Sequence, residues 1–163
     1  MEIREVTKED RETIRELELL CFKEYLEKSE ASRWEEISQD LIDQLGVSSE
    51  NTFDHYLEQG MSYVALEEGR MVGFLFAKII HHVYDVPTAV WLENMGVHPE
   101  HRRRGVGYRL LEHLIKEGSG READVLLSSI MTDNLESIML HRKLGFLMDD
   151  RKMAFLGLDQ VEP

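Results

Sequence analysis

The segment from Val97 to Leu111 constrains the fold of this chain most, because it joins an apolar strand to an amphipathic helix through a turn rich in arginine and glycine. A helix that begins at about Gly105 leaves its first N–H groups without intrahelical partners and carries a partial positive charge at that end. The segment therefore predicts a strand, a turn and a helix whose N-terminus can bind an anion. Apolar residues recur after the turn at the spacing of one helix face: Val106, Leu110, Leu111 and Leu114.

Arginines and glycines determine the chemistry of this turn. Arg102, Arg103 and Arg104 add positive charge, and Gly105 and Gly107 lack the Cβ atoms that would block the approach of a phosphate to the N–H groups. A solvated basic run before an ordinary core helix is the alternative interpretation. The order of strand, paired glycines and helix favours a pyrophosphate site.

A second segment, about thirty residues further on, carries related information. Ala123–Ile130 reads as a buried strand, and Thr132–Phe146 reads as a helix with its exit turn. Asn134, Ser137 and His141 are separated by three and four residues, so they share one helix face. Asn134 taken alone is typical of a helix cap, but its amide can also donate to and accept from the amides of a ligand.

Both segments resemble motifs of one family. Arg102-x-x-Gly105-x-Gly107 resembles the Arg/Gln-x-x-Gly-x-Gly/Ala acyl-CoA signature of the GNAT superfamily of N-acyltransferases. The segment after Thr132 is similar to that family's Asn-x-x-Ala/Ser-x-x-Leu-Tyr-x-x-x-Gly-Phe helix. The resemblance implies that acetyl-CoA is the cosubstrate. It implies an acyl-CoA site that consists of Met95, Gly96, Val97, Arg102, Arg103, Arg104, Gly105, Val106, Gly107, Tyr108, Asn134 and Ser137.

The strand before the turn bears on the rest of that site. If the strand Ala89–Val97 splays from the strand Ala123–Ile130, the backbone groups of Met95, Gly96 and Val97 become free to pair with the pantetheine amides like an added strand. Gly96 also fits a place where another group approaches the backbone closely.

His141 stands where the family commonly has a tyrosine that protonates the departing thiolate. Imidazole can act as an acid near neutral pH, so His141 is a candidate for that role. A thiol has a pKa of about 8.5, so the thiolate also leaves at pH 7 with little help. An exposed or structural histidine is the alternative.

Glu93 is the candidate base. An alkyl amine with a pKa of about 10.4 is less than roughly 0.1 per cent neutral at pH 7, and only the neutral form attacks a thioester. Strand alternation places Glu93 on the same face as Met95 and Val97, and a β-bulge near Asn94–Gly96 would change that facing. A solvent-facing glutamate is the alternative.

The favoured function is direct transfer of an acetyl group from acetyl-CoA to a primary amine within a ternary complex. The acceptor is either a small amine or a protein N-terminus or lysine. A module that binds or senses acyl-CoA without turnover is the second interpretation, because the family's tyrosine is missing.

The order of elements resembles the family over nearly the whole chain. It implies an α/β (α+β) fold: a mixed, mostly antiparallel sheet of about six to seven strands with a splayed central parallel pair, flanked by about four helices. We expect one domain over residues 1–163. Besides the segments above, the expected strands are Glu2–Val6, Tyr63–Glu67, Met71–His82 and Lys152–Leu158, and the expected helices contain Ile14, Leu17 and Leu20, then Trp34, Ile37, Leu41 and Leu45, then Phe53, Tyr56 and Leu57.

Composition excludes several classes of protein. The net charge of −13 argues against a nucleic-acid surface, and no apolar run is long enough to span a membrane. The only cysteine, Cys21, is in register with core residues and suits a reducing cytoplasm, and the charged N-terminus does not resemble a signal peptide. His81 and His82 point to opposite strand faces, so no metal site is expected. The sequence leaves the oligomeric state open, a homodimer included.

Overall fold

The computed structural model describes residues 1–29, 33–49 and 52–150. Short 3-10 turns lie at Lys8–Asp10, Trp34–Glu36 and Pro99–His101. The strands and α-helices follow in the order β1 (Glu2–Glu5), α1 (Arg11–Ser29), α2 (Gln39–Gln44), α3 (Phe53–Glu58), β2 (Tyr63–Glu67), β3 (Arg70–Val83), β4 (Val86–Val97), α4 (Val106–Gly120), β5 (Val125–Ser128) and α5 (Leu135–Lys143).

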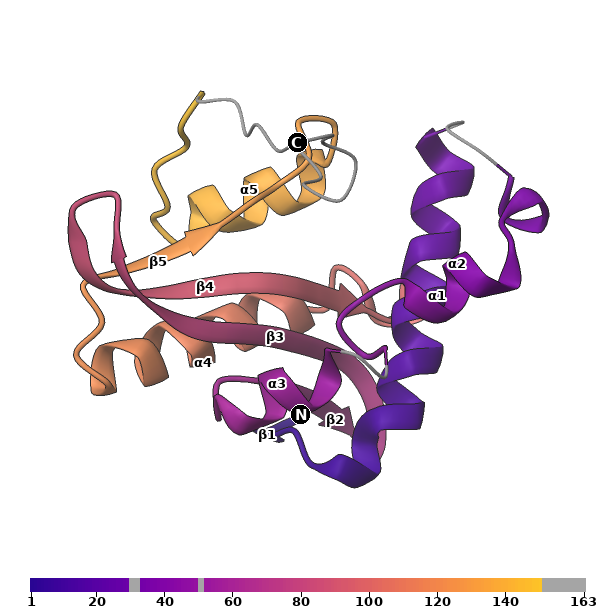
Figure 1. Ribbon diagram of the computed structural model, residues 1–163, viewed down its shortest axis with the longest axis horizontal. Helices are drawn as coiled ribbons and strands as arrows, with labels where there is room; N and C mark the ends of the chain where they lie inside the picture. Colours follow the sequence, from indigo (N-terminus) through magenta and orange to yellow (C-terminus); the bar gives the residue numbers. More distant parts are fainter. Residues whose placement is uncertain (30–32, 50–51, 151–163) are drawn as a thin grey trace, which may run out of the picture.

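The strands form one mixed sheet in the order β1-β2-β3-β4-β5 (Figure 1). The first three pairings are antiparallel, and β4 pairs with β5 in parallel. This confirms the mostly antiparallel sheet with a parallel pair. The described residues contain five strands, and the expected strand Lys152–Leu158 lies outside them.

The segment from Trp34 to Leu45 is not the continuous helix that its spacing predicted. A 3-10 turn ends at Glu36, Ile37 is extended, and α2 begins only after Ser38. The Ser38 hydroxyl accepts a hydrogen bond from the N–H of Leu41 at 3.3 Å, which stabilises a new helix start at that point. The described residues contain five α-helices, of which α2 is shorter than its spacing predicted.

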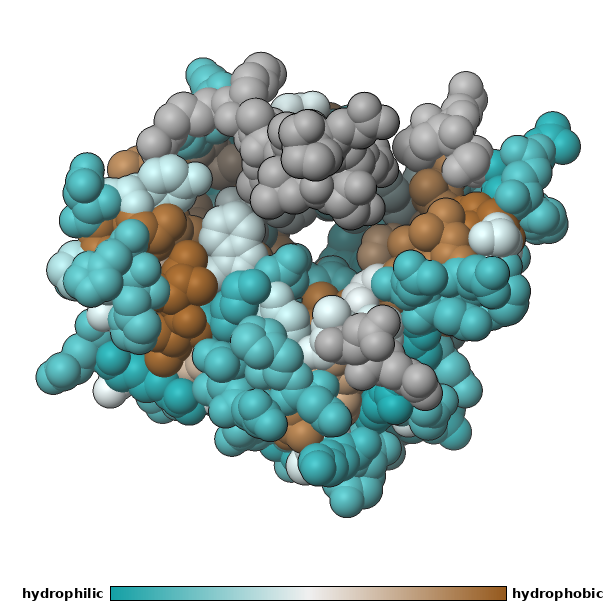
Figure 2. Space-filling view, in the orientation of Figure 1, coloured by the Kyte–Doolittle hydropathy of each residue, from teal (hydrophilic) through white to brown (hydrophobic). Residues whose placement is uncertain are grey.

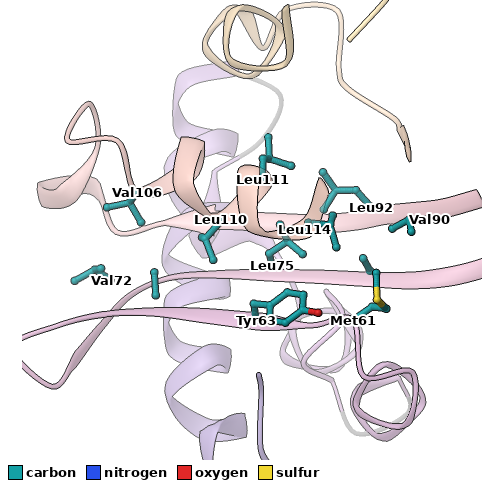
Figure 3. Packing of buried hydrophobic residues seen from close by; sticks show 12 residues of the cluster. Met61, Tyr63, Val72, Leu75, Val90, Leu92, Val106, Leu110, Leu111 and Leu114 are labelled. Atoms are coloured by element: carbon teal, nitrogen blue, oxygen red, sulfur yellow. The ribbon is translucent and has the colours of Figure 1, made fainter. Parts of the chain in front are cut away.

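Each face of the sheet has its own hydrophobic core. Helix α4 covers one face, and the residues predicted for its apolar stripe are buried there (Figure 3). Helices α1 and α3 cover the other face, where Ile14 and Leu17 of α1 pack against Phe74 and Phe76 of β3. Leu20, which the same helical spacing assigned to the core, is 39% exposed. Helices cover both faces of the sheet. The central strands therefore place apolar side chains on each face.

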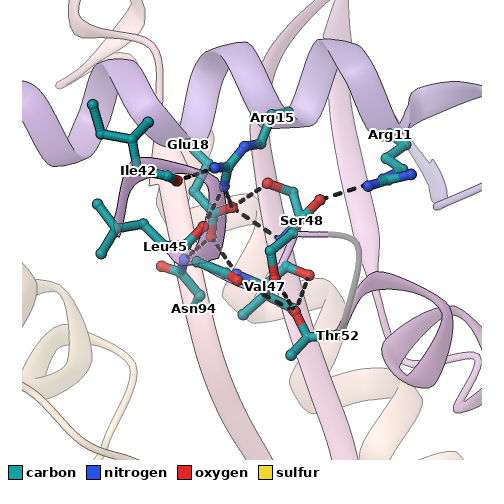
Figure 4. A network of polar contacts seen from close by, with 11 residues as sticks. Arg11, Arg15, Glu18, Ile42, Leu45, Val47, Ser48, Thr52 and Asn94 are labelled. Carbon is teal, nitrogen blue, oxygen red and sulfur yellow. Dashed lines mark hydrogen bonds and ion pairs between the residues drawn. The ribbon is translucent and has the colours of Figure 1, made fainter. Parts of the chain in front are cut away.

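A buried carboxylate fastens α1 to the sheet and to the loop after α2 (Figure 4). Glu18 is 1% exposed and accepts hydrogen bonds from the N–H groups of Val47 (2.9 Å) and Ser48 (3.0 Å). The Ser48 hydroxyl and the side-chain amide of Asn94 in β4 donate to the same carboxylate. Arg15 lies 4.0 Å from it and also donates to two carbonyl groups at the end of α2. The network satisfies a charge that would otherwise be costly to bury.

Near the end of β4, Gly96 allows α1 and β3 to approach the strand closely. A Cβ atom at this position would lie 2.4 Å from the ring of Phe74 and 3.1 Å from the sulfur of Cys21. Burial raises the pKa of the Cys21 thiol, although Arg102 nearby lowers it in part. The close approach predicted for Gly96 is therefore confirmed, and the groups that make it are side chains of the core.

No helix within the described parts of the chain is long and apolar enough to cross a membrane.

Replacing Gly96 with alanine should destabilise the fold, because the added methyl group has no space beside Phe74 and Cys21. We expect a loss of about 1–3 kcal/mol in the free energy of unfolding, measured by urea denaturation. Gly120→Ala is the matched control, since a Cβ atom there has no neighbour within 4 Å. Equal unfolding midpoints for the two variants would contradict the packing argument.

Candidate active site

The parallel strands β4 and β5 separate after a short stretch of pairing. Their register runs from Ala89 opposite Val125 to Leu92 opposite Ser128, where β5 ends, whereas β4 continues to Val97. The expected splay of the two strands is therefore confirmed. The space that opens is a cleft of about 160 Å³, and Figure 2 shows an opening at the centre of the molecule, above β4 in that orientation. The cleft is lined by Leu92, Glu93, Asn94, Met95, Ser128, Ser129, Ile130, Met131, Asn134, Ser137 and His141.

The edge of β4 that faces the cleft carries free backbone groups beyond Leu92. His98 N–H donates to the Val72 carbonyl of the preceding strand at 2.9 Å, and hydrogen-bonded pairs alternate along an antiparallel ladder. The backbone groups of Met95 therefore point away from β3, and those of Gly96 point toward it. The Val97 carbonyl accepts from Arg102 Nε at 3.2 Å. Of the three residues expected to offer backbone groups to pantetheine, Met95 is placed to do so, Gly96 pairs with β3, and the carbonyl of Val97 is taken.

A β-bulge places Glu93 on the α1 and α3 face of the sheet. Leu92 pairs with Ala77 and Asn94 pairs with Phe76, so Glu93 has no partner on β3. Met95 and Val97 pack against the core beneath α4, whereas the Glu93 carboxylate reaches the hydroxyl of Tyr56 in α3. The expectation that Glu93 shares a face with Met95 and Val97 is therefore wrong, because the extra residue reverses the alternation.

The Glu93 carboxylate is held by three donors at one oxygen. Oε2 accepts from the Tyr56 hydroxyl at 2.7 Å and from Trp91 Nε1 at 2.8 Å, and Lys78 Nζ lies 3.5 Å away. The side chain remains 36% exposed and lines the cleft. Burial, together with the hydrogen bond to Glu93, raises the pKa of Tyr56 well above its ordinary value. The hydroxyl of Tyr56 therefore keeps its proton and donates it to Glu93.

At the other end of β4, the arginine-rich turn leads into α4 through Gly105. Gly105 has a φ of +86° and open space around its missing Cβ, as a left-handed turn next to a ligand requires. The first intrahelical bond runs from Arg109 N–H to the Gly105 carbonyl, so the N–H groups of Val106, Gly107 and Tyr108 have no acceptor within the helix. The predicted helix end is therefore formed, and the binding of an anion there stays a prediction.

The three arginines of the turn have different surroundings. Arg102 donates to Glu24 Oε1 in α1 at 2.8 Å and forms an ion pair with Oε2 of the same carboxylate at 2.6 Å, besides its bond to the Val97 carbonyl. Although burial opposes it, hydrogen bonds from Lys28 and Arg102 hold the pKa of Glu24 below its ordinary value. Arg103 and Arg104 are exposed. Arg102 thus fastens the turn to α1, and the other two are the ones that face solvent.

Two more residues of the turn differ in their surroundings. A Cβ atom on Gly107 would lie 3.3 Å from Leu140 of α5, so the absence of a side chain there serves helix packing. Tyr108 is half-buried, with Lys143 Nζ 5.1 Å from the centre of its ring. The space around the missing Cβ is therefore open at Gly105 and filled by Leu140 at Gly107, and a phosphate at either glycine stays a prediction.

Helix α5 brings its predicted face to the opposite wall of the cleft. Asn134 is the N-cap, and its side chain accepts from the N–H of Ser137 at 3.1 Å. His141 is 2% exposed, and its Nδ1 lies 2.8 Å from the Ser137 carbonyl. Since a carbonyl only accepts, Nδ1 carries the proton. Nε2 is buried without a partner among the described residues, and burial lowers the pKa of His141.

Several residues of the site were missed from the sequence. Tyr56 was assigned only to the core of a short helix, Lys78 only to a strand, and Glu18 and Glu24 to no role. These residues are separated from Glu93 and Arg102 in the sequence by intervals that match no helix or strand period, so no local pattern predicts the contacts. Among residues 1–29, 33–49 and 52–150, no group of three or more His, Cys, Asp or Glu side chains is placed to hold a metal ion.

Comparison with known proteins shows relatives that are acetyltransferases. The [ribosomal protein bS18]-alanine N-acetyltransferase of Escherichia coli (strain K12) is 33% identical over 99 residues, which is 60% of this chain and 63% of that protein. The aminoglycoside N(6')-acetyltransferase type 1 of Salmonella typhimurium (strain LT2) is 30% identical over 97 residues, or 58% of this chain and 67% of that protein. The match thus spans less than two thirds of the bS18-alanine acetyltransferase.

Solved structures show the same fold over nearly the whole chain. The aminoglycoside N-acetyltransferase AAC(6')-Iy, in complex with a bisubstrate analogue, superposes with a TM-score of 0.70 at 23% identity, covering 96% of this chain and 97% of that one. The antibiotic 6'-N-acetyltransferase AAC(6')-IG from Acinetobacter haemolyticus gives a TM-score of 0.68 at 18% identity, covering 96% and 98%. The fold implied by the resemblance to the GNAT superfamily is therefore confirmed.

A family model described as "Protein of unknown function (DUF1999)" matches residues 1–162. Because this match spans nearly the whole chain, the protein belongs to that family, and it has the fold of the GNAT acetyltransferases.

Proposed function

We propose that this protein transfers an acetyl group from acetyl-CoA to a primary amine by direct attack in a ternary complex. The observation that carries the proposal is the cleft between β4 and β5, which has a free helix N-terminus near one end and a hydrogen-bonded carboxylate on its wall. The first feature suits a pyrophosphate, and the second suits removal of a proton from an amine. The acetyltransferase relatives support the same reaction.

Acetyl-CoA would be held along β4. The N–H groups of Val106, Gly107 and Tyr108, with the side chains of Arg103 and Arg104, would hold the pyrophosphate. The backbone of Met95 would pair with the pantetheine arm, and Ser137 is small enough to leave the arm room. Asn134 and Arg102 would contribute by keeping α5 and the turn in place.

Glu93 would act as the base. As the amine nitrogen attacks the thioester carbonyl, its proton passes to the Glu93 carboxylate, directly or through water. The donors on the carboxylate reach Oε2, and no described residue donates to Oε1, which can therefore accept this proton. The C–S bond then breaks and the thiolate leaves.

His141 would remain neutral during the reaction. Its proton is on Nδ1 and is donated to Ser137, so Nε2 presents a lone pair and no proton. Protonation of Nε2 would place a cation in a buried site, which burial disfavours. In this proposal the thiolate leaves unprotonated, as a thiol pKa of about 8.5 allows, and His141 as an acid is the alternative.

The reaction is tested by thiol release from acetyl-CoA with a panel of amines. The names of the relatives suggest an alanine-initiated peptide and an aminoglycoside as the first members of the panel. Amine-dependent release of thiol would support the proposal. Acetyl-CoA binding without release from any amine would instead favour the acyl-CoA-binding module. A cytoplasmic reaction is part of the proposal, and the single cysteine supports it.

Removing both exposed arginines of the turn should weaken acetyl-CoA binding, because each would neutralise phosphate charge. We expect Arg103→Ala with Arg104→Ala to raise the Kd about tenfold in calorimetry, with less effect at high salt. Lys8→Ala with Lys116→Ala removes the same charge from exposed positions elsewhere and should leave the Kd unchanged. An unchanged Kd in the arginine variant would overturn the pyrophosphate assignment.

Replacing Glu93 with glutamine should slow acetylation most at low pH. At pH 7 almost all of an alkyl amine is protonated and needs a base, whereas near pH 9.4 about one tenth is already neutral. We expect kcat/KM to fall about 100-fold at pH 7 and less at pH 9.4, with unchanged acetyl-CoA affinity. Glu12→Gln, an exposed change on α1, is the control. A loss that does not vary with pH would argue against a base at this position.

Changing His141 to phenylalanine should leave the chemical step nearly intact. We expect kcat within about twofold of the native value from pH 6 to 9, since the neutral imidazole has no proton to give at Nε2. The aromatic ring keeps the edge contact with Phe146, whose centroid lies 4.7 Å away. A large fall in kcat with an unchanged melting temperature would restore the acid role.

A further inference from the structure

Tyr56 contacts the Glu93 carboxylate from another element of the fold. It lies on α3, is 5% exposed, and its ring packs against Phe76 with the centroids 5.9 Å apart. Its hydroxyl lies 2.7 Å from Glu93 Oε2. Glu93 itself is on a bulge without a partner on β3 and is one third exposed, so its carboxylate is held by side chains: Trp91 of the same strand and Tyr56 of α3.

The direction of this hydrogen bond follows from Lys78. An ammonium group only donates, and Lys78 Nζ donates to the Tyr56 hydroxyl at 3.1 Å. The single proton of the hydroxyl is therefore directed at Glu93. Trp91 Nε1, which also only donates, reaches the same oxygen. Oε2 is thus saturated, and the remaining acceptor capacity of the carboxylate is at Oε1.

We infer that Tyr56 is a positioning residue for catalysis: its hydroxyl holds Glu93 Oε2 so that Oε1 is kept free for the proton of the attacking amine. This inference rests on the proposed role of Glu93 as the base. Without the hydrogen bond from Tyr56, the partly exposed side chain of Glu93 can adopt more rotamers. It then spends less time in the rotamer that directs Oε1 at the amine.

The test is Tyr56→Phe, which keeps the ring and removes only the hydroxyl. With the panel amine that releases thiol fastest, we expect kcat/KM for the amine to fall about tenfold at pH 7, with the acetyl-CoA KM within twofold. Tyr63→Phe is the matched control, since Tyr63 is 4% exposed but packs in the core beneath α4. Trp91→Phe, which removes the second donor, should act in the same direction as Tyr56→Phe.

A double variant separates positioning from a general structural effect. If Tyr56 acts through Glu93, then Tyr56→Phe should cost nothing further in a Glu93→Gln background. An equal loss in both backgrounds, or an equal loss from Tyr63→Phe, would overturn the inference. If Glu93→Gln is slow and Tyr56→Phe is not, only the positioning role fails. If Glu93→Gln keeps the full rate, the base assignment fails and the positioning role fails with it.

Discussion

The buried carboxylate of Glu18 joins three segments that are far apart in the sequence, and the α1 side of the cleft depends on it. The carboxylate accepts hydrogen bonds from the backbone after α2, and its neighbour Arg15 donates to the carbonyl groups at the end of α2. It also accepts from Asn94, which directly follows the unpaired residue of the bulge in β4. A charge at 1% exposure is tolerated only when its acceptor sites are filled, so the three segments must come together for any of them to be stable. Through Asn94 the same network holds the strand next to Glu93.

The cleft itself results from a difference in strand length. β5 ends at Ser128 opposite Leu92, while β4 continues for five more residues toward the turn before α4. The unpaired edge of β4 then offers backbone groups that water or a ligand must satisfy. Helix α5 closes the far wall with Ser137 and a neutral His141. One sheet edge therefore connects the anion-binding turn to the carboxylate.

Much of this arrangement follows from local sequence. The apolar stripe of α4, the hairpin between β2 and β3, the helix stop at Gly145 and the cap at Asn134 each depend on residues within a few positions of one another. Errors occurred where a distant contact or an extra residue decides. Ser38 divides one expected helix in two, and the bulge at Glu93 reverses the facing of that residue. Arg102 looked equivalent to its two neighbours, but Glu24 of α1 binds it.

The sequence by itself determined the class of fold, the helix end that suits a pyrophosphate and the identity of the candidate base. These follow from periodicity, glycine positions and motif spacing, which are properties of neighbouring residues. Only the tertiary structure decided which residues surround that base. Tyr56, Lys78 and Trp91 meet at one carboxylate oxygen because α3, β3 and β4 pack together. Contacts between segments that are remote in the chain depend on the packing of whole elements, and no local pattern encodes them.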